Sequence, residues 1–493
     1  MIEAFFFRQR KAILFLFIPL LSLCMHWHIF KTDLVGYHVW RQTQTQNTIL
    51  SFYREDFNIL KPRISNRGNG SGIFRMEFPI MQWGIACFYK IFGDHLIITR
   101  ILSFIIGLFS IWGIYLLLYN IFKIHRLALF GAWCFNFSPV FYYYTLNPMP
   151  DNLALCLSIY GMAFFFKWIE NPEYVYDIWS AAFISLSVLS KMPFVVYIGG
   201  IVVYLLMNIR KIGINSFIKI GLIFFAILFL PALWYVKVVG TWQGNGIVTG
   251  VLSAGKQDIS NLLDILQGNL ISILPELLIN YGSLLFFFAG FFLLFSSKKY
   301  RHPLFPLFFG WGISVLLYFL FEMNMINTVH DYYMFPFLPL IFIIVGYGAE
   351  KLISHPKKIL RIVSVAALCI LPITAFLRAD HRWNTIDPGF NANLLTYKND
   401  LQNILPDNKL CVVGNDESSC IWFYYINKKG WAFDNDWLDE KSLKEMISQG
   451  AAYLYTDSKK VQQDTGIKSC IDRLILQRGD VCVYALKQAT LQY

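Results

Sequence analysis

Charged residues are scarce in this chain. Only 15% of its 493 residues are Asp, Glu, Lys or Arg, whereas 56% are hydrophobic. Soluble domains usually contain about 25% charged residues, and the mean hydropathy here is +0.49. The composition therefore excludes an ordinary soluble protein and predicts a membrane protein.

Several well-known motifs are absent as well. The sequence contains no P-loop, no GxGxxG, no HExxH and no CxxC. The first two bind nucleotides, so their absence argues against a nucleotide-driven pump. The last two serve metal or redox chemistry, and no Cys/His cluster replaces them. A structural metal is therefore not expected.

What the sequence does contain is a series of long apolar runs. A membrane-spanning helix needs roughly 17 to 25 predominantly apolar residues, and about eleven runs meet this requirement. They are 12–30, 98–119, 127–146, 152–168, 176–190, 192–209, 217–236, 277–296, 303–322, 331–349 and 359–377. The expected fold class is therefore an α-helical polytopic membrane protein.

Positive charge at every second junction between runs sets the orientation. Short loops rich in Lys and Arg stay in the cytoplasm, which places the N-terminus inside and the C-terminus outside. The residues concerned are Arg8, Arg10, Lys11, Lys123, Arg126, Arg210, Lys211, Lys298, Lys299, Arg301, Lys351, Lys357, Lys358 and Arg361. They account for most of the net charge of +11 and indicate anionic membrane lipids, not nucleic acid, as the partner.

Two polar segments, 31–97 and 238–275, connect spans on the outer side and are expected to carry surface helices. Within the first, the apolar stretch 78–92 is too short to span and is typical of a helix lying along the surface. The second contains five glycines, Gly240, Gly244, Gly246, Gly250 and Gly255. It favours either a lid over a lipid-facing groove or a disordered connector.

The composition changes after residue 378, where the apolar runs end. Residues 1–378 are therefore expected to form the membrane domain and 379–493 a soluble domain outside the cytoplasm. Alternating patterns predict strands at 410–414, 430–434, 452–456 and 480–486, with helices at 418–427 and 438–449. Strands that alternate with helices imply a small α/β fold.

Whether the cysteines of the soluble domain form disulfides depends on its location outside the cytoplasm. Four of the nine cysteines, Cys411, Cys420, Cys470 and Cys482, lie in the soluble domain. An oxidising exterior would permit one or two disulfides among them, and four cysteines allow three pairings.

Polar side chains of chemical interest gather on the outer side. The first outer loop contributes His38, Arg41, Gln42, Gln44, Glu77 and Gln82, and three further junctions contribute Asp151, Lys191, His330, Asp331 and Tyr332. Asp151 after Pro150 is equally compatible with a helix start, and Lys191 with snorkelling. A lysine on the outer face nevertheless calls for an anionic partner.

Ionisable groups at membrane level that converge on one side usually mark a substrate site. Carboxylates together with cations suit one reaction class. A carboxylate takes the proton from an acceptor hydroxyl, that oxygen attacks the anomeric carbon of a sugar, and cations stabilise the departing phosphate. No nucleotide is needed if the sugar arrives on a lipid phosphate.

Five segments carry a family resemblance. They are WRQTQT at 40–45, MEFPIMQW at 76–83, NPMPDNLAL at 147–155, LSKMP at 189–193 and HDYYMFPFLPL at 330–340. In this order and sidedness the chain resembles the bacterial C-type glycosyltransferases, which are similar to protein O-mannosyltransferases and lipid A aminoarabinose transferases. The resemblance covers residues 1 to 378, and the tail looks like the small external α/β domain of many members.

The resemblance implies an inverting transfer from a polyprenyl-phosphate (undecaprenyl-phosphate) sugar to a cell-envelope acceptor at the outer face of the inner membrane. Lipopolysaccharide, another surface glycan or a protein hydroxyl would serve as the acceptor. Arg41, Lys191, His330 and Tyr332 are then expected at the donor phosphate, and His38, Gln42, Gln44, Gln82 and Asp331 are expected to position substrate. No cofactor is required, although the family leaves room for a divalent cation.

One departure affects the catalytic base. Many relatives have an acidic residue within the stretch that corresponds to 41–45, and this chain has none there. The role then falls to Glu77, Asp151 or Asp33, or activity has been lost. Glu77 is favoured as the base, and Asp151 is assigned to acceptor positioning or a divalent cation. The rival functions are a non-catalytic assembly scaffold and a flippase for a lipid-linked sugar.

Overall fold

The computed structural model describes residues 16–241, 259–296, 302–328, 330–406 and 408–488. Its backbone contacts divide the chain into two compact units. The helical unit comprises Met1–Phe30, Met76–Phe78 and Arg100–His381, and the sheet unit comprises Lys31–Arg75, Pro79–Thr99 and Arg382–Tyr493. The first outer loop therefore belongs, except for residues 76–78, to the same unit as the tail.

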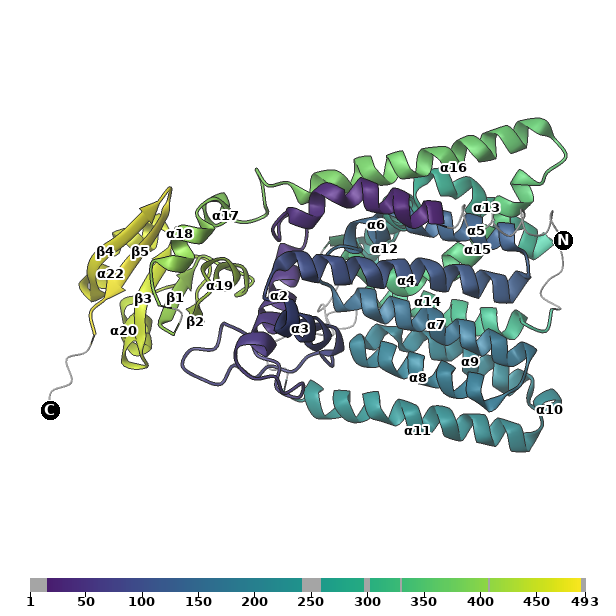
Figure 1. The fold of residues 1–493 in the computed structure, drawn as a ribbon, viewed down its shortest axis with the longest axis horizontal. Coiled ribbons are helices and arrows are strands. Elements are labelled where there is room, and N and C mark those ends of the chain that lie inside the picture. Colours follow the sequence, from purple (N-terminus) through teal and green to yellow (C-terminus); the bar gives the residue numbers. More distant parts are fainter. Residues whose placement is uncertain (1–15, 242–258, 297–301, 329, 407, 489–493) are drawn as a thin grey trace. The chain divides into compact units, whose positions relative to one another are not determined.

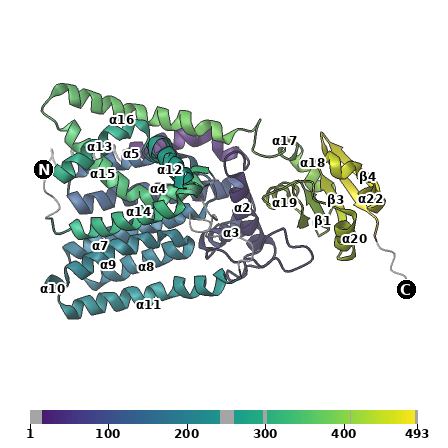
Figure 2. The same cartoon turned by 180° about the vertical axis from the view of Figure 1, so that it is seen from behind.

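Long helices that run side by side make up the helical unit (Figures 1 and 2). They are α4 (Leu96–Phe122), α5 (His125–Asn136), α6 (Pro139–Tyr144), α7 (Pro150–Glu170), α8 (Tyr174–Ser190), α9 (Val196–Met207), α10 (Ile209–Ile212), α11 (Ile214–Val239), α12 (Ile259–Gly268), α13 (Tyr281–Ser296), α14 (Phe305–Thr328), α15 (Leu338–Ile353) and α16 (Lys358–Ala379). Short 3₁₀ turns are η1 (Trp27–Lys31), η2 (Met192–Val195), η5 (Asp331–Phe337) and η6 (Asp380–Trp383), and η3 (Asn269–Ile279) is a π-helix.

Among the residues that the structure describes, seven helical stretches are long and apolar enough to cross a membrane: Leu96–Phe122, Pro150–Glu170, Ile214–Val239, Ser260–Ile279, Phe305–Ile326, Asp331–Ile353 and Lys358–Trp383. Four shorter apolar helices accompany them, namely Leu16–Lys31, Tyr174–Ser190, Met192–Met207 and Tyr281–Leu294. Every predicted run except 127–146 overlaps one of these stretches. The helical membrane class is confirmed, and the number of crossings stays a prediction.

The run 127–146 is broken between α5 and α6. Pro139 begins α6 and has no backbone N–H to donate. The Phe137 carbonyl at the break accepts a hydrogen bond from Asn280 Nδ2 at 2.9 Å, and Ser138 Oγ donates to the Leu278 carbonyl at 2.7 Å. Because a broken helix in an apolar setting needs its backbone groups satisfied, the bond from Asn280 makes the break tolerable, and the bond from Ser138 connects the break to η3.

The segment 238–275 contains a helix where the structure describes it, in agreement with the expectation of helices there. Residues from Ile259 onward form α12, which continues directly into η3, and Gly240 follows α11 as its C-cap. The glycines at 244, 246, 250 and 255 lie outside the described residues.

The sheet unit combines outer-loop helices with an α/β fold. Its helices are α2 (Val39–Arg54), α3 (Ile80–Phe92), α17 (Ala392–Thr396), α18 (Lys398–Asn403), α19 (Ile421–Ile426), α20 (Glu440–Ser448), α21 (Lys459–Gln463) and α22 (Thr465–Cys470). The strands are β1 (Leu410–Gly414), β2 (Lys429–Ala432), β3 (Ala451–Thr456), β4 (Ile471–Arg478) and β5 (Val481–Leu486). The surface helix expected at 78–92 is confirmed as a helix, α3.

The five strands lie in the order β2-β1-β3-β5-β4, with β2, β1 and β3 parallel and β5 antiparallel to both β3 and β4. The four predicted strands are confirmed within a residue or two at their ends. Strand β4 was missed because its burial does not alternate and its register shifts twice along β5. The α/β class of the tail is confirmed.

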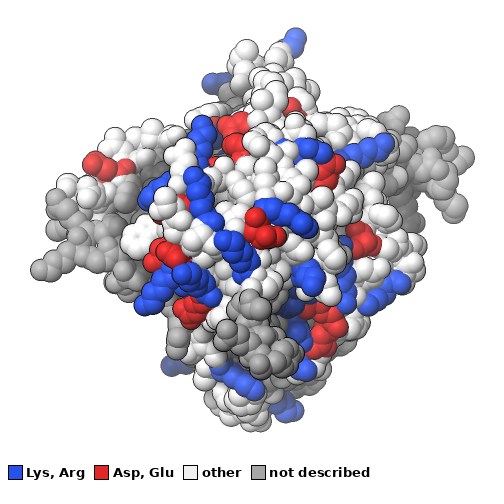
Figure 3. Space-filling model, turned by 90° about the vertical axis from the view of Figure 1, so that its left-hand side faces the viewer, with Lys and Arg blue, Asp and Glu red and all other residues white. Residues whose placement is uncertain are grey.

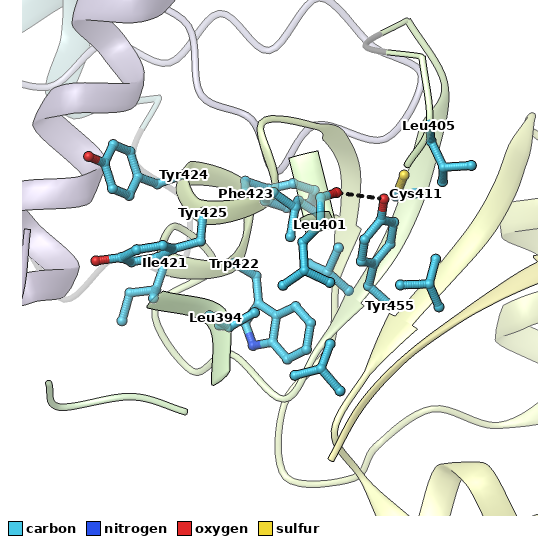
Figure 4. Close-up of a cluster of buried hydrophobic side chains, with 14 of the residues drawn as sticks. Leu394, Leu401, Leu405, Cys411, Ile421, Trp422, Phe423, Tyr424, Tyr425 and Tyr455 are labelled. Atoms are coloured by element: carbon cyan, nitrogen blue, oxygen red, sulfur yellow. Dashed lines mark hydrogen bonds between the residues drawn. The ribbon is translucent and has the colours of Figure 1, made fainter. Parts of the chain in front are cut away.

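An aromatic cluster forms the core of this unit. Trp422, Phe423 and Tyr425 of α19 pack with Leu394 and Leu401 (Figure 4). The Tyr455 hydroxyl of β3 donates to the Leu401 carbonyl at 3.2 Å, which Figure 4 shows as a dashed line. Trp422 Nε1 donates to the Asn415 carbonyl at 2.8 Å. Burying a polar atom costs free energy unless the atom is hydrogen-bonded. These two bonds satisfy the Tyr455 hydroxyl and the Trp422 N–H, so both rings can be buried in the core.

The disulfide prediction is wrong. Cys411, Cys420, Cys470 and Cys482 are all buried and free. Cys411 lies on β1 and Cys482 on β5, two strands that are not neighbours in the sheet. Burial raises the pKa of the Cys411 and Cys420 thiols to about 12. The four thiols therefore serve as small packing residues.

Residues of the first outer loop pair with the edge strand β2. The amides of Arg67 and Gly68 donate to the Gly430 carbonyl at 2.8 and 2.7 Å, and the Gly430 amide donates to the Ser65 carbonyl at 3.1 Å. The loop thereby covers a strand edge that would otherwise expose unpaired backbone groups. On the face shown in Figure 3, basic and acidic side chains are interspersed.

Gly430 is the position most sensitive to substitution in this pairing. Its φ is +146°, and an added Cβ would lie 1.9 Å from the backbone oxygen of Cys411. We expect Gly430→Ala to lower the free energy of unfolding by about 3 kcal/mol or more, the range of severe backbone conflicts. Gly84→Ala in α3 is the matched control, because nothing lies within 4 Å of its Cβ position. Thermal unfolding of both variants tests the close approach of Gly430 to Cys411 of β1, and equal melting temperatures would refute it.

Glu55 links the loop to β2 by charge. It pairs with Arg67 at 2.8 Å and with Lys429 at 3.0 Å. Burial alone would raise the pKa of this carboxyl, but hydrogen bonds from Lys429 and Arg67 outweigh burial and hold the pKa below its ordinary 4.5. A lowered folded-state pKa gives stability that is present above the unfolded pKa and is lost as the pH falls through the folded value.

We therefore expect Glu55→Gln to melt below the wild type at pH 7, by about 2–4 °C for each kcal/mol lost. The gap should close as the pH falls through the lowered pKa of Glu55 in the folded protein, because the wild-type carboxyl then also becomes neutral. Thermal unfolding of the two proteins at several pH values measures this gap. A gap of the same size at pH 3 and pH 7 would exclude the charge pairing as its cause.

Candidate functional site

Two charged residues from different junctions meet in the helical unit. Pro150 is the first residue of α7, which places Asp151 in the first helical turn. Lys191 follows α8 in an extended conformation, and its Nζ lies 3.6 Å from Asp151 Oδ2. The Lys191 side chain is 15% exposed and the Asp151 side chain is 3% exposed. The expected anionic partner of Lys191 is therefore Asp151, and the helix-start interpretation of Asp151 holds at the same time.

The aromatic residues of η5 complete the surroundings of Lys191. Its Nζ lies 5.7 Å from the ring centre of Tyr332 and 5.8 Å from that of Tyr333. His330 Nδ1 lies 3.3 Å from the Tyr332 hydroxyl. The ammonium group therefore faces two aromatic rings, which attract cations, and a carboxylate oxygen at 3.6 Å. The ammonium group is thus placed to interact with an incoming anion.

Asp331 serves a different purpose from its neighbours. Its Oδ1 accepts a hydrogen bond from the Tyr144 hydroxyl at 2.5 Å, and the Tyr144 ring lies 5.6 Å from that of Tyr332. This bond connects α6 to η5. Asp331 therefore fixes the position of the Tyr332 ring, and thereby the surroundings of Lys191.

The connector between α6 and α7 is held by residues that sequence reasoning missed. Arg100 of α4, fully buried, donates to Asn147 Oδ1 at 3.1 Å and to the Leu146 carbonyl at 3.3 Å. Asn152 donates to the carbonyls of Tyr144 and Asn147 at 2.8 and 2.9 Å. The signal was an arginine inside an otherwise apolar run, which in a membrane protein marks a functional or positioning role.

Glu77 lies in residues 76–78, the short stretch of the first outer loop that belongs to the helical unit. The Phe78 amide donates to the Leu189 carbonyl at 2.9 Å, and Trp234 Nε1 of α11 donates to the Met76 carbonyl at 3.0 Å. Both backbone neighbours of Glu77 are thus anchored, and its side chain is buried. Leu189 precedes Lys191 by two residues, so Glu77 is held beside the same end of α8.

A second buried carboxylate near Lys191 was also missed. Glu322 of α14 is buried and lies within electrostatic range of Lys191. Tyr318, one turn earlier on α14, lies within range of Glu322, Asp151, Tyr332 and Tyr333. The sequence signal was again a charged residue near the end of an apolar run. The buried surroundings of Lys191 thus contain two carboxylates.

The remaining predicted residues come together in the sheet unit. His38 adopts a left-handed backbone (φ 55°) directly before α2. Arg41 donates to Gln44 Oε1 one turn later, and Gln42 Nε2 donates to the Tyr37 carbonyl at 3.0 Å. Gln82 lies buried in α3, which packs against α2. The structure therefore groups the predicted residues into two sets, one in each unit.

Asp33, an alternative base, is occupied by structural contacts. Lys398 Nζ lies 2.6 Å from its Oδ2, and the Tyr424 hydroxyl donates to its Oδ1 at 2.6 Å. The Leu34 amide adds a third bond at 2.8 Å. These contacts connect the outer loop to α18 and α19, and they occupy both oxygens of Asp33 with structural donors.

The described residues contain no group of three or more His, Cys, Asp or Glu side chains that could hold a metal ion. A divalent cation would have to rely on fewer protein ligands and on substrate oxygens. The chemistry that the side chains near Lys191 can perform without a metal is proton transfer and stabilisation of an anion.

Comparisons with known proteins agree with this architecture. Residues 77–235 match the family described as dolichyl-phosphate-mannose-protein mannosyltransferase. ArnT from Cupriavidus metallidurans in the apo state aligns with a TM-score of 0.66 at 12% identity, covering 98% of each chain. The same protein bound to undecaprenyl phosphate gives a TM-score of 0.61 at 11% identity, covering 97% of this chain and 98% of that one.

The arabinofuranosyltransferase AftD from mycobacteria aligns with a TM-score of 0.59 at 12% identity, covering 98% of this chain and 40% of that chain. A comparison with curated protein sequences found no match. At these identities structural likeness establishes the fold. The resemblance drawn from the sequence is confirmed at that level: this chain has the fold of the C-type glycosyltransferases.

Proposed function

We propose that this protein is an inverting glycosyltransferase. It moves a sugar from a polyprenyl-phosphate donor to a hydroxyl of a cell-envelope acceptor. The observation that carries the proposal is the buried Asp151–Lys191 pair beside the tyrosines of η5. It occurs in a fold shared with ArnT, a protein that binds undecaprenyl phosphate.

The donor phosphate binds at Lys191 in this proposal. The ion pair with Asp151 is long at 3.6 Å, so a phosphate oxygen can approach the ammonium without displacing a tight partner. The Tyr332 hydroxyl, beside His330 Nδ1, supplies a neutral donor to the same phosphate. The sequence resemblance also assigns Arg41 of α2 to the donor phosphate. Phosphate is well matched by such charge-assisted donors.

Glu77 acts as the base. Its carboxylate takes the proton of the acceptor hydroxyl, the freed oxygen forms a bond to the anomeric carbon, and the bond from that carbon to the phosphate oxygen breaks. The polyprenyl phosphate leaves with the electron pair, and Lys191 stabilises its charge. A single displacement of this kind inverts the anomeric configuration. Asp151 orients Lys191 and helps to position the acceptor or a divalent cation, and His38, Gln42, Gln44, Gln82 and Asp331 position substrate.

The reaction takes place at the outer face of a bacterial inner membrane, with the sheet unit in the periplasm. The Lys/Arg pattern of the short loops supports this orientation. The acceptor is lipopolysaccharide, another surface glycan or a protein hydroxyl.

Transfer of label tests the proposal. Full-length protein in lipid nanodiscs is incubated with radiolabelled polyprenyl-phosphate sugars and cell-envelope acceptors. Label that moves to an acceptor in wild type, and fails to move in folded Glu77→Gln, supports a transferase. Donor binding without transfer from any donor, unchanged by Glu77→Gln and Lys191→Met, would instead indicate a scaffold or a flippase.

A further inference from the structure

Helix α2 is unusual because it is polar and yet buried. Most of its 16 residues are buried, including Arg41, Gln42, Thr43, Thr45, Gln46 and Asn47. Buried polar side chains are hydrogen-bonded in the great majority of cases. Each exception therefore needs an explanation.

The threonines and the asparagine of α2 follow the general rule. Thr43 Oγ1 donates to the Trp40 carbonyl and Thr45 Oγ1 to the Arg41 carbonyl, both at 3.0 Å. Asn47 Nδ2 donates to the Cys420 carbonyl at 3.0 Å, which anchors α2 to α19. These three side chains have internal structural roles.

Gln42 and Gln46 follow this rule only in part, because one of the two polar atoms of each side-chain amide is hydrogen-bonded. Gln42 Nε2 donates to the Tyr37 carbonyl at 3.0 Å, and Gln46 Nε2 donates to the Tyr89 hydroxyl at 2.8 Å. Both residues are almost fully buried, at 0% and 2% exposure. In each, Oε1 has no hydrogen-bond partner within the part of the chain that the structure describes. The nitrogen bonds fix both amides and leave two acceptor oxygens unused.

Gln42 and Gln46 lie four residues apart in α2. Residues four apart lie on the same face of a helix, so the two acceptors belong to one surface of α2. An unsatisfied buried acceptor costs about 1–3 kcal/mol. A ligand that offers two donors to this face would remove both costs at once.

The ligand's charge follows from the rest of the helix. α2 contains no Asp or Glu, and it carries Arg41 one residue before Gln42. A cationic ligand group would meet an uncharged acceptor beside a guanidinium, whereas hydroxyl groups would meet no repulsion. We propose that Gln42 and Gln46 form a recognition site for the hydroxyl groups of a neutral sugar, and that this site rejects amino sugars. This inference rests on the proposed function, because the sugar belongs either to the donor or to the acceptor.

Binding of free glycosides tests the inference without requiring turnover. Saturation-transfer NMR on the full-length protein in nanodiscs would compare neutral methyl hexopyranosides with their monodeoxy and amino analogues. Loss of a hydroxyl that bonds to a buried acceptor is worth about 1–3 kcal/mol. We therefore expect about 5- to 150-fold weaker binding for one monodeoxy analogue and for the amino sugar. Equal binding of all three classes would overturn the inference.

Variants of α2 locate the effect. Gln42→Leu or Gln46→Leu should abolish the discrimination between the parent glycoside and its deoxy analogue. Thr48→Val is the matched control, because its hydroxyl donates to the Gln44 carbonyl and should leave the discrimination intact. If neither leucine variant folds, the deoxy series on the wild type still decides the question.

Introducing a carboxylate at position 46 should reverse the preference between neutral and amino sugars. Burial raises the pKa of Tyr89 above its ordinary 10.0, so its protonated hydroxyl can donate to a carboxylate in Gln46→Glu. This variant should favour the amino sugar over the neutral one, and an unchanged preference would count against the inference. Competition by polyprenyl-phosphate hexose or by acceptor glycan identifies the sugar's source. Glycoside binding without any transfer would refute the proposed function alone, and transfer indifferent to both glutamines would refute this inference alone.

Discussion

Replacing Glu77 by glutamine is expected to lower the transfer rate by about 10²- to 10⁴-fold, the usual contribution of a general base. Glutamine keeps the size and polarity of the side chain but cannot take a proton from the acceptor hydroxyl. The backbone on both sides of Glu77 is anchored to Leu189 and Trp234, so the substitution should leave the fold intact. Steady-state kinetics with saturating donor measures the loss as a fall in kcat, with little change in the KM for the donor.

Glu55→Gln provides the matched control for this experiment. It is the same chemical change at a carboxylate that pairs with Arg67 and Lys429 in the sheet unit. We expect near wild-type transfer from it at pH 7. If Glu77→Gln retains more than about a tenth of the activity while Asp151→Asn loses it, the base role passes to Asp151. Asp33 is a poor alternative because Lys398 and Tyr424 occupy both of its oxygens.

The features that sequence predicted well are those set by local composition. Apolar runs of sufficient length mark helices because the backbone must satisfy itself in lipid, and nearly all of them reappear as helices. The position of Lys191 predicted an anionic partner from the charge rule alone, and Asp151 fills that place. Local sequence patterns also located strands: the buried apolar run 410–414 predicted β1, and the alternation of 480–486 predicted β5.

The features that sequence missed depend on partners far along the chain. Strand β4 has an irregular burial pattern that only its pairing with β5 explains. Arg100 and Glu322 lie inside apolar runs, where their partners, Asn147 and Lys191, could not be recognised without the fold.

The pairing of the outer loop with β2 is the clearest case of a non-local feature. Nothing in residues 65–68 identifies Gly430 as a partner some 360 positions later. The boundary drawn at residue 378 by composition therefore separates segments that fold together in one unit. The composition of a segment indicates whether it is surrounded by lipid or by water, but it does not indicate which other segments it packs against.

Removing Lys191 should affect stability and activity in separable ways. In Lys191→Met the buried Asp151 carboxylate loses its ion-pair partner, and breaking such a pair typically costs about 3–5 kcal/mol. Asp151→Asn should cost less, because Lys191 still lies within electrostatic range of Glu322. The double variant Lys191→Met/Asp151→Asn should recover most of the stability, since it leaves no uncompensated charge at this pair.

Activity should not recover with stability. Without the ammonium group the donor phosphate loses a charge-assisted contact, so we expect kcat/KM for the donor to stay about 10²- to 10³-fold below wild type in the double variant. Thermal unfolding in nanodiscs and transfer kinetics on the same preparations provide both measurements. A double variant as unstable as Lys191→Met would show that the two side chains are not energetically coupled. A double variant with restored transfer would remove Lys191 from the donor site, because its effect on activity would then be one of stability alone.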